Sequence, residues 1–211
     1  MYTALIIEPR RHPALQFVLK NFLENLDERW QFIIFHGTDN EEWLRDMINK
    51  EFIADKDRIQ LNNLNVSNLS WEEYNRHCTT AEFIEQIPTE IFLKFETDSM
   101  VCPSEKDLIY NFLKYDYVGA PWLKTPGSTN EFNGKVGNSG LSLRKKSKIL
   151  EVIENIHIPM ELRRMDISVY IMTPSNYIDL VMKKPNYFPW KLYFHLVVSD
   201  YIRHGYIKEI K

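Results

Sequence analysis

Two carboxylates, Glu96 and Asp98, have the clearest chemical potential, because they follow a short run of strand-forming residues. Side chains alternate along a strand, so the two carboxylates point the same way if the strand continues through them. Two such oxygens suit a hard divalent cation, which would neutralise a bound diphosphate. The alternative is structural: Asp98 and Ser99 cap the next turn, and Glu96 is a solvated edge residue. The pattern alone leaves both interpretations open.

A second polar segment, residues 137–144, reads Gly-Asn-Ser-Gly-Leu-Ser-Leu-Arg. Gly137 and Gly140 would let the backbone approach a ligand closely, and Asn138 and Ser139 could hydrogen-bond sugar hydroxyls. A hairpin turn or a bulge leading into a strand is the alternative, and these residues alone favour it.

Three further side chains could contact a sugar or a phosphate. Trp122 offers the flat apolar face that sugar rings often need, although a tryptophan after Gly-Ala-Pro fills a core equally often. Arg10 and Arg11 could meet a phosphate through forked hydrogen bonds, whereas a solvated basic turn is the default for such a pair.

The histidines carry less information. His36, His195 and His204 each fit a packing or surface position better than a ligand position, although one of the last two could complete a metal shell. Neither Gly-x-Gly-x-x-Gly after the first strand nor a Walker-type phosphate loop occurs. A nucleotide-sugar site requires neither motif.

The apolar periodicity of the chain predicts the elements that position these residues. Strands are expected at 4–7, 32–35, 58–61, 90–95 and 115–118, order resumes over 136–143, and helices are expected at 15–23, 40–48, 72–84, 107–113 and 146–156. Alternating strands and helices are typical of a parallel sheet with crossover helices. The sequence therefore predicts an α/β protein with a single domain over residues 1–211, in which ligands bind beyond the carboxyl ends of the strands.

The less periodic segments carry two further expectations. Residues 123–136 are rich in Gly, Pro, Ser, Thr and Asn, which predicts an exposed, mobile loop that could close over a ligand. Towards the C-terminus, possible elements cover 166–172, 177–182 and 193–202.

The composition excludes several classes of protein. The 26 Lys and Arg against 29 Asp and Glu give a formal charge of −3, which argues against a nucleic-acid binder. Cys78 and Cys102 are too few for a disulfide scaffold, and we expect both to be reduced and at least half-buried. The apolar run at 4–7 is too short for a signal-peptide core or a membrane span, so we expect a cytoplasmic protein without a transmembrane segment.

The order of the motifs resembles that of a known family. The motifs are Ile-Ile-Glu-Pro-Arg at 6–10, Phe-His-Gly at 35–37, Phe-Glu-Thr-Asp-Ser at 95–99, Tyr-Asp-Tyr-Val-Gly-Ala-Pro-Trp at 115–122 and the segment at 137–144. As a set they resemble glycosyltransferase-like domains of the GT-A type, found in microbes and large viruses, over roughly residues 3–170. This resemblance implies a Rossmann-like α/β fold with a mixed, mostly parallel central sheet flanked by helices.

The resemblance also implies roles for individual residues. A Mn²⁺ or Mg²⁺ ion would bind at an Asp-x-Asp-like motif, here Glu96-Thr97-Asp98; family members often carry a neutral residue in the first position, so Asp98 is the safer ligand. Glu8 and Arg10 would face the nucleotide base and ribose, and residues 137–142 would line the donor-sugar pocket. The substrate-binding candidates are therefore Glu8, Arg10, His36, Thr97, Trp122, Gly137, Asn138, Ser139 and Gly140.

The resemblance points to Asp166 as the catalytic base. The family carries a Glu-Asp pair about one helix after the glycine-rich segment, and the counterpart here is Met165-Asp166, without the first acid. Asp200 is a rival for the same role.

The residues and the resemblance together predict a metal-dependent glycosyltransferase that moves a sugar from a nucleotide-diphosphate donor, uridine or guanosine based, to a hydroxyl acceptor on a glycan or protein. A metal-dependent phosphoesterase is the first alternative, because acids and a serine at a strand end could equally bind a phosphate. A non-catalytic carbohydrate-binding module is the second.

Overall fold

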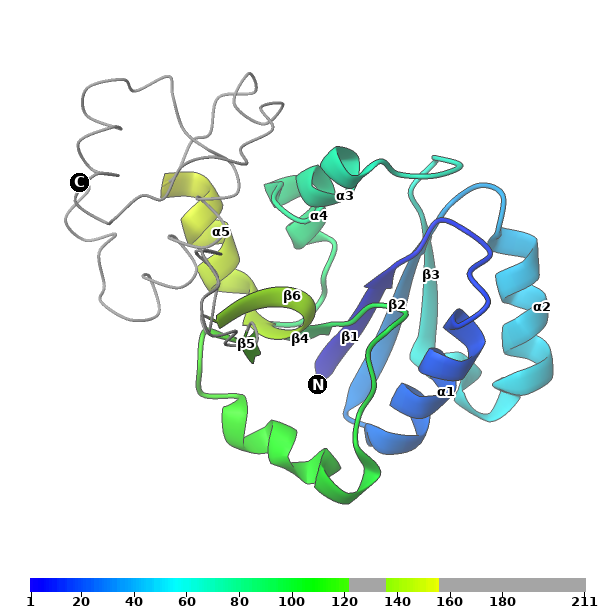
Figure 1. Cartoon of the computed structure of the whole chain (residues 1–211), viewed down its shortest axis with the longest axis horizontal. Coiled ribbons are helices and arrows are strands. Elements are labelled where there is room, and N and C mark those ends of the chain that lie inside the picture. Colours follow the sequence, from blue (N-terminus) through cyan, green and yellow to red (C-terminus); the bar gives the residue numbers. More distant parts are fainter. Residues whose placement is uncertain (122–135, 156–211) are drawn as a thin grey trace, which may run out of the picture. The chain divides into compact units, whose positions relative to one another are not determined.

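The strands of the described part of the chain form one six-stranded sheet in the order β3-β2-β1-β4-β6-β5 (Figure 1). The computed structural model describes residues 1–121 and 136–155. The chain divides into two compact units, one of residues 1–118 and 139–150 and one of residues 119–138 and 151–211. The elements expected at 166–172, 177–182 and 193–202, and all but the last residue of the expected loop at 123–136, lie outside the described residues. The single-domain arrangement stays a prediction.

Parallel pairing dominates the sheet. The strands are β1 (Tyr2–Ile7), β2 (Trp30–His36), β3 (Ile59–Asn63), β4 (Ile91–Lys94), β5 (Tyr117–Pro121) and β6 (Val136–Lys145). β1 pairs in parallel with β2 and with β4, β2 pairs in parallel with β3, and β6 runs antiparallel to β4. The predicted α/β fold with a mixed, mostly parallel central sheet flanked by helices is confirmed.

The helices follow the predicted apolar spacing with one exception. They are α1 (Leu15–Asn25), α2 (Glu41–Glu51), α3 (Trp71–His77), α4 (Ala81–Glu85) and α5 (Lys146–Asn155), with 3₁₀ helices η1 (Ile53–Arg58) and η2 (Pro103–Phe112). The continuous helix expected at 72–84 is wrong, because Thr80 takes an extended conformation and its side chain accepts a hydrogen bond from the Phe83 amide, which starts a new helix. The short helix expected at 107–113 is present as the 3₁₀ helix η2, which begins earlier, at Pro103.

The central strands are covered on both faces. On one face, buried side chains of β1, β2, β4 and β6 share a core with α1 and α2; Phe22 of α1 stacks on Phe95 with ring centroids 4.1 Å apart. On the other face, Phe35 of β2 contacts Phe83 of α4 at 4.5 Å. Burial on both faces explains why the strands are continuous apolar runs rather than alternating ones.

The chain order places a switch point between β1 and β4. From β1 the chain passes through α1 to β2 and through α2 to β3, and it then returns to the opposite side of β1 to form β4. Ligands of open α/β sheets bind outside the carboxyl ends of the strands at such a point. The segments after Ile7 and after Lys94 border it.

Two expectations from the composition can be compared with the structure. Both cysteines are free, as predicted, but Cys102 is exposed rather than half-buried because it lies at the start of the surface helix η2. No helix in the described part of the chain is long and apolar enough to cross a membrane.

Candidate functional site

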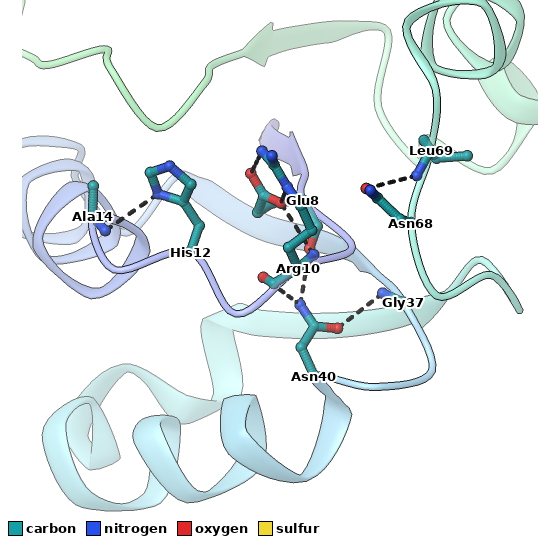
Figure 2. A network of polar contacts seen from close by, with 8 residues as sticks. All are labelled: Glu8, Arg10, His12, Ala14, Gly37, Asn40, Asn68 and Leu69. Carbon is teal, nitrogen blue, oxygen red and sulfur yellow. Dashed lines mark hydrogen bonds and ion pairs between the residues drawn. The ribbon is translucent and has the colours of Figure 1, made fainter.

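Glu8, directly after β1, holds Arg10 in place. One oxygen of the buried Glu8 carboxylate accepts hydrogen bonds from Arg10 Nε at 2.8 Å and from the Arg10 backbone amide at 3.0 Å, and the other accepts one from Nη2 at 3.0 Å (Figure 2). This hydrogen bonding and the negative charge of Glu8 raise the pKa of Arg10. The Arg10 side chain is still 57% exposed. It is therefore the member of the pair that a ligand can reach.

Asn40 ties this segment to the loop that follows β2. Its fully buried amide donates to the carbonyl oxygens of Glu8 and Arg10 at 3.0 and 2.9 Å, and its Oδ1 accepts from the Gly37 amide at 2.9 Å (Figure 2). The sequence predicts Asn40 only as the start of a helix, so this role is not predicted. The signal in the sequence is an asparagine three residues after Gly37, the glycine that follows β2.

The end of β2 is tightly packed. The buried His36 places Nδ1 2.7 Å from the Gly37 carbonyl oxygen, and since a carbonyl only accepts, Nδ1 carries the proton. A Cβ on Gly37 would lie 2.6 Å from the carbonyl oxygens of Pro9 and Val66, so only glycine fits. His36 is therefore buried and hydrogen-bonded to the adjacent backbone, as expected of a packing position.

The extended geometry considered for Glu96 and Asp98 is wrong, because β4 ends at Lys94. The chain turns instead: the Ser99 amide donates to the Glu96 carbonyl at 3.0 Å, and Ser99 Oγ accepts from the Glu96 amide at 3.2 Å. Thr97 and Asp98 occupy the two middle positions of this turn. Ser99 is thus the turn-capping residue, and Asp98 is not.

Glu96 pairs with a lysine that the sequence analysis did not consider. Lys94 is only 2% exposed, and its ammonium lies 2.6 Å from Glu96 Oε1 and 3.2 Å from the Ser139 carbonyl oxygen. Tyr74 of α3 donates to the same Glu96 oxygen at 2.8 Å. Burial alone would raise the pKa of Glu96, but the charge of Lys94 and the hydrogen bonds from Lys94 and Tyr74 outweigh burial and lower it. The signal for Lys94 was a lone lysine inside the apolar run Ile-Phe-Leu-Lys-Phe.

Asp98 is exposed, and its carboxylate has no hydrogen bond or ion pair with any described residue. Small divalent ions are commonly bound through one or two carboxylates together with substrate phosphates. No three His, Cys, Asp or Glu side chains within 1–121 and 136–155 cluster closely enough to hold a metal. Asp98 therefore offers one unpaired carboxylate just beyond the carboxyl end of β4.

The glycine-rich segment forms the first half of β6 and contributes carbonyl groups. The Ser139 carbonyl accepts from Lys94, and the Gly140 carbonyl accepts from Ser99 Oγ at 3.2 Å, so both join the turn after β4. Gly137 and Asn138 precede them in the same strand. Trp122, Asp166, His195, Asp200 and His204 lie outside the described residues.

The Glu96–Lys94 pair predicts a pH-dependent contribution to stability. Because folding lowers the pKa of Glu96, the stabilisation is present above the ordinary glutamate value of 4.5 and is lost as the pH falls through the folded value. Glu96→Gln should therefore lower the melting temperature at pH 7, and the difference from wild type should shrink towards pH 3. Thermal melts at successive pH values measure this, with the exposed Glu85→Gln as control. A difference that stays constant down to pH 3 would contradict the assignment.

Comparison with known proteins gives a family and several structural neighbours. A search of curated proteins found no match. The mannosyltransferase PcManGT from Pyrobaculum calidifontis, in complex with GDP-Man and Mn²⁺, aligns at 10% identity over 71% of this chain and 46% of its own, with a TM-score of 0.49. The apo-form glycosyltransferase GlyE from Streptococcus pneumoniae TIGR4 aligns at 12% identity over 100% and 52%, also at 0.49. The 4-diphosphocytidyl-2C-methyl-D-erythritol synthase from Anaerococcus prevotii DSM 20548 aligns at 12% over 89% and 85%, at 0.48.

The chain spans about half the length of the mannosyltransferase and of GlyE. Residues 58–183 match a family model, and this range contains the turn after β4, β6 and Asp166. Because the match covers more than half of the chain, the protein belongs to the family described as "Protein of unknown function (DUF5672)".

Proposed function

We propose that the protein is a metal-dependent glycosyltransferase, which moves a sugar from a nucleotide-diphosphate sugar to a hydroxyl group of a glycan or protein. One observation carries the proposal: the two segments at the switch point each present an exposed charged side chain, Arg10 after β1 and Asp98 after β4. A guanidinium suits the oxygens of a nucleotide, and a carboxylate suits a cation that accompanies a diphosphate. The motif resemblance supports the same assignment.

Arg10 is the proposed contact to the nucleotide. Glu8 already accepts three hydrogen bonds from Arg10, so it acts on the ligand by orienting that guanidinium. Asn40 fixes the backbone of both residues through their carbonyl groups. The ligand therefore meets a donor group whose geometry is set before binding, which lowers the entropic cost of recognition.

Asp98 is the proposed ligand of Mn²⁺ or Mg²⁺. When bound, the ion stabilises the negative charge that develops on the leaving diphosphate. Glu96 is assigned to Lys94 rather than to the ion, because its Oε1 already accepts from that ammonium and from Tyr74. Three predicted binding positions support this donor site. Thr97 lies in the same turn as Asp98, the Gly140 carbonyl accepts a hydrogen bond from Ser99 of that turn, and the Ser139 carbonyl accepts one from Lys94.

The acceptor step requires a base. For an inverting course, a carboxylate must reach the acceptor hydroxyl within about 3 Å, directly or through one water, to remove its proton. Asp166 is the proposed base, with Asp200 as its rival.

Titration of the full chain with a panel of nucleotide sugars, with and without Mn²⁺, tests the proposal. The panel includes GDP-mannose, the donor present in the mannosyltransferase complex. We expect calorimetry to show metal-dependent binding of one donor. We also expect that donor to be hydrolysed slowly when it is incubated with the protein and Mn²⁺. Hydrolysis of simple phosphate esters without donor binding would indicate a phosphoesterase instead, and binding of free glycan alone would indicate a carbohydrate-binding module.

A further inference from the structure

Arg144 of β6 carries a buried nitrogen that the structure leaves unpaired. The residue is 3% exposed, and its Nε donates to Ser142 Oγ at 2.9 Å. Its Nη2 has no hydrogen-bond partner. Within residues 1–121 and 136–155, it is the one buried side-chain nitrogen or oxygen atom that lacks such a partner. A buried donor without a partner is costly, so it calls for a physical explanation.

The strand register places Arg144 on the same face of the sheet as Lys94. In the antiparallel pair of β4 and β6, Lys94 is opposite Ser142 and Phe92 is opposite Arg144. Directly opposed residues, and residues two apart in one strand, share a face. Leu93 and Leu143 lie on the other face, in the core shared with α1. The two buried cations therefore face the side on which Tyr74 of α3 meets Glu96.

The described groups around these cations do not balance their charge. The positive charge of Arg144 affects the pKa values of Tyr74, Cys78, Glu96 and Tyr117, which identifies these as its titratable neighbours. Burial raises the pKa of both tyrosines and of the thiol, so they are neutral at pH 7. Glu96 is the one carboxylate in this set, and it is bonded to Lys94. Among the described groups, one positive charge therefore remains in excess, and it belongs to Arg144, whose Nη2 has no hydrogen-bond partner.

We propose that Lys94 and Arg144 form an oxyanion site that receives a phosphate group of the donor's diphosphate. The choice of ligand rests on the proposed function, whereas the geometry and the charge excess do not. Arg144 Nη2 supplies the free donor, and guanidinium groups bind phosphate oxygens with strong, directional hydrogen bonds. Glu96 is the solvent-facing member of the cluster, with its side chain 37% exposed, so the anion enters beside it.

Pyrophosphate in metal-free buffer is the direct probe, because it needs neither Asp98 nor a nucleotide. We expect pyrophosphate to raise the melting temperature of the wild-type chain, and Arg144→Met to weaken its binding at least tenfold. Without ligand, Arg144→Met should melt at or above the wild-type temperature, because it removes an uncompensated buried charge. The matched control is Lys145→Met, which alters the next residue of β6, a lysine already paired with Asp116 at 2.9 Å. Equal stabilisation of wild type and Arg144→Met by pyrophosphate, or no stabilisation of wild type, would overturn the proposal.

Glu96→Gln gives a second test that does not depend on the folding of Arg144→Met. Glutamine can still accept from Lys94 and Tyr74, but it removes the negative charge that repels an incoming anion. Pyrophosphate affinity should therefore rise in this variant, and unchanged or reduced affinity would overturn the proposal.

The experiment separates the oxyanion site from the proposed function. If pyrophosphate binds through Arg144 and no nucleotide sugar binds, the oxyanion site stands and the glycosyltransferase assignment fails. If a nucleotide sugar binds in Mn²⁺ equally well to wild type and to Arg144→Met, the assignment stands and the oxyanion site fails. A parallel titration with inorganic phosphate shows whether a single phosphate group is sufficient.

Discussion

Asp98→Asn is expected to lower the affinity for a nucleotide sugar in Mn²⁺ by about tenfold or more, equivalent to roughly 1.4 kcal/mol of binding free energy. The substitution keeps the shape of the side chain but removes the charge that a divalent cation requires. The melting temperature should stay nearly unchanged, because Asp98 is exposed and pairs with no described residue. Calorimetric titration in Mn²⁺, together with a thermal melt, measures both quantities.

The matched control for this variant is Asp107→Asn, which removes an exposed carboxylate from η2. It should change neither the affinity nor the melting temperature. If Asp98→Asn also leaves donor affinity unaltered, the carboxylate does not hold the cation. A marked fall in melting temperature would instead indicate that Asp98 has a structural role in the turn.

Asn40→Ala should destabilise the protein by about 3 kcal/mol, because it removes three hydrogen bonds at a fully buried position and leaves their backbone partners unsatisfied. In a chain of this size, that loss corresponds to a fall in melting temperature of roughly 6–12 °C. Chemical denaturation and thermal melts give the two values. Donor affinity should fall as well, since Asn40 fixes the backbone of Glu8 and Arg10.

Two companion variants sharpen the interpretation of Asn40→Ala. Asn49→Ala changes an exposed asparagine on α2, and its effect on stability should be close to zero. Asn40→Asp keeps the acceptor for the Gly37 amide but loses both donated hydrogen bonds, so it should also be strongly destabilised. A loss below about 1 kcal/mol in Asn40→Ala, the value of one ordinary hydrogen bond, would show that the three contacts do not act as a clamp.

The break between α3 and α4 shows why a periodic pattern was insufficient in that region. Apolar residues keep helical spacing up to Phe83 and Ile84, so the sequence predicted one helix over 72–84. Thr80 instead competes for the backbone through its own side chain and starts α4. Such a local hydrogen bond does not change the apolar periodicity, and only the structure reveals it.

The local sequence pattern was sufficient to predict most of the fold and the position of the candidate site. The strands are buried on both faces and appear as continuous apolar runs, and the first helices carry an apolar stripe, so the α/β class followed from residues near one another in the chain. The candidate residues after β1 and β4 could be located for the same reason, because the rule for strand ends needs only the order of elements.

The partners of the charged side chains depended on the tertiary structure. Lys94 and Arg144 are separated by about fifty residues, and the register between β4 and β6 puts them on one face with Glu96 and Tyr74. A shift of one residue in this register would have placed Lys94 and Arg144 on opposite faces of the sheet. The different environments of the two carboxylates also depend on the structure. The turn from Glu96 to Ser99 leaves Asp98 exposed, whereas Glu96 pairs with Lys94. The register is set by contacts between distant segments, and a sequence read locally contains no record of it. The turn forms through hydrogen bonds between residues three apart, which the apolar pattern does not reveal.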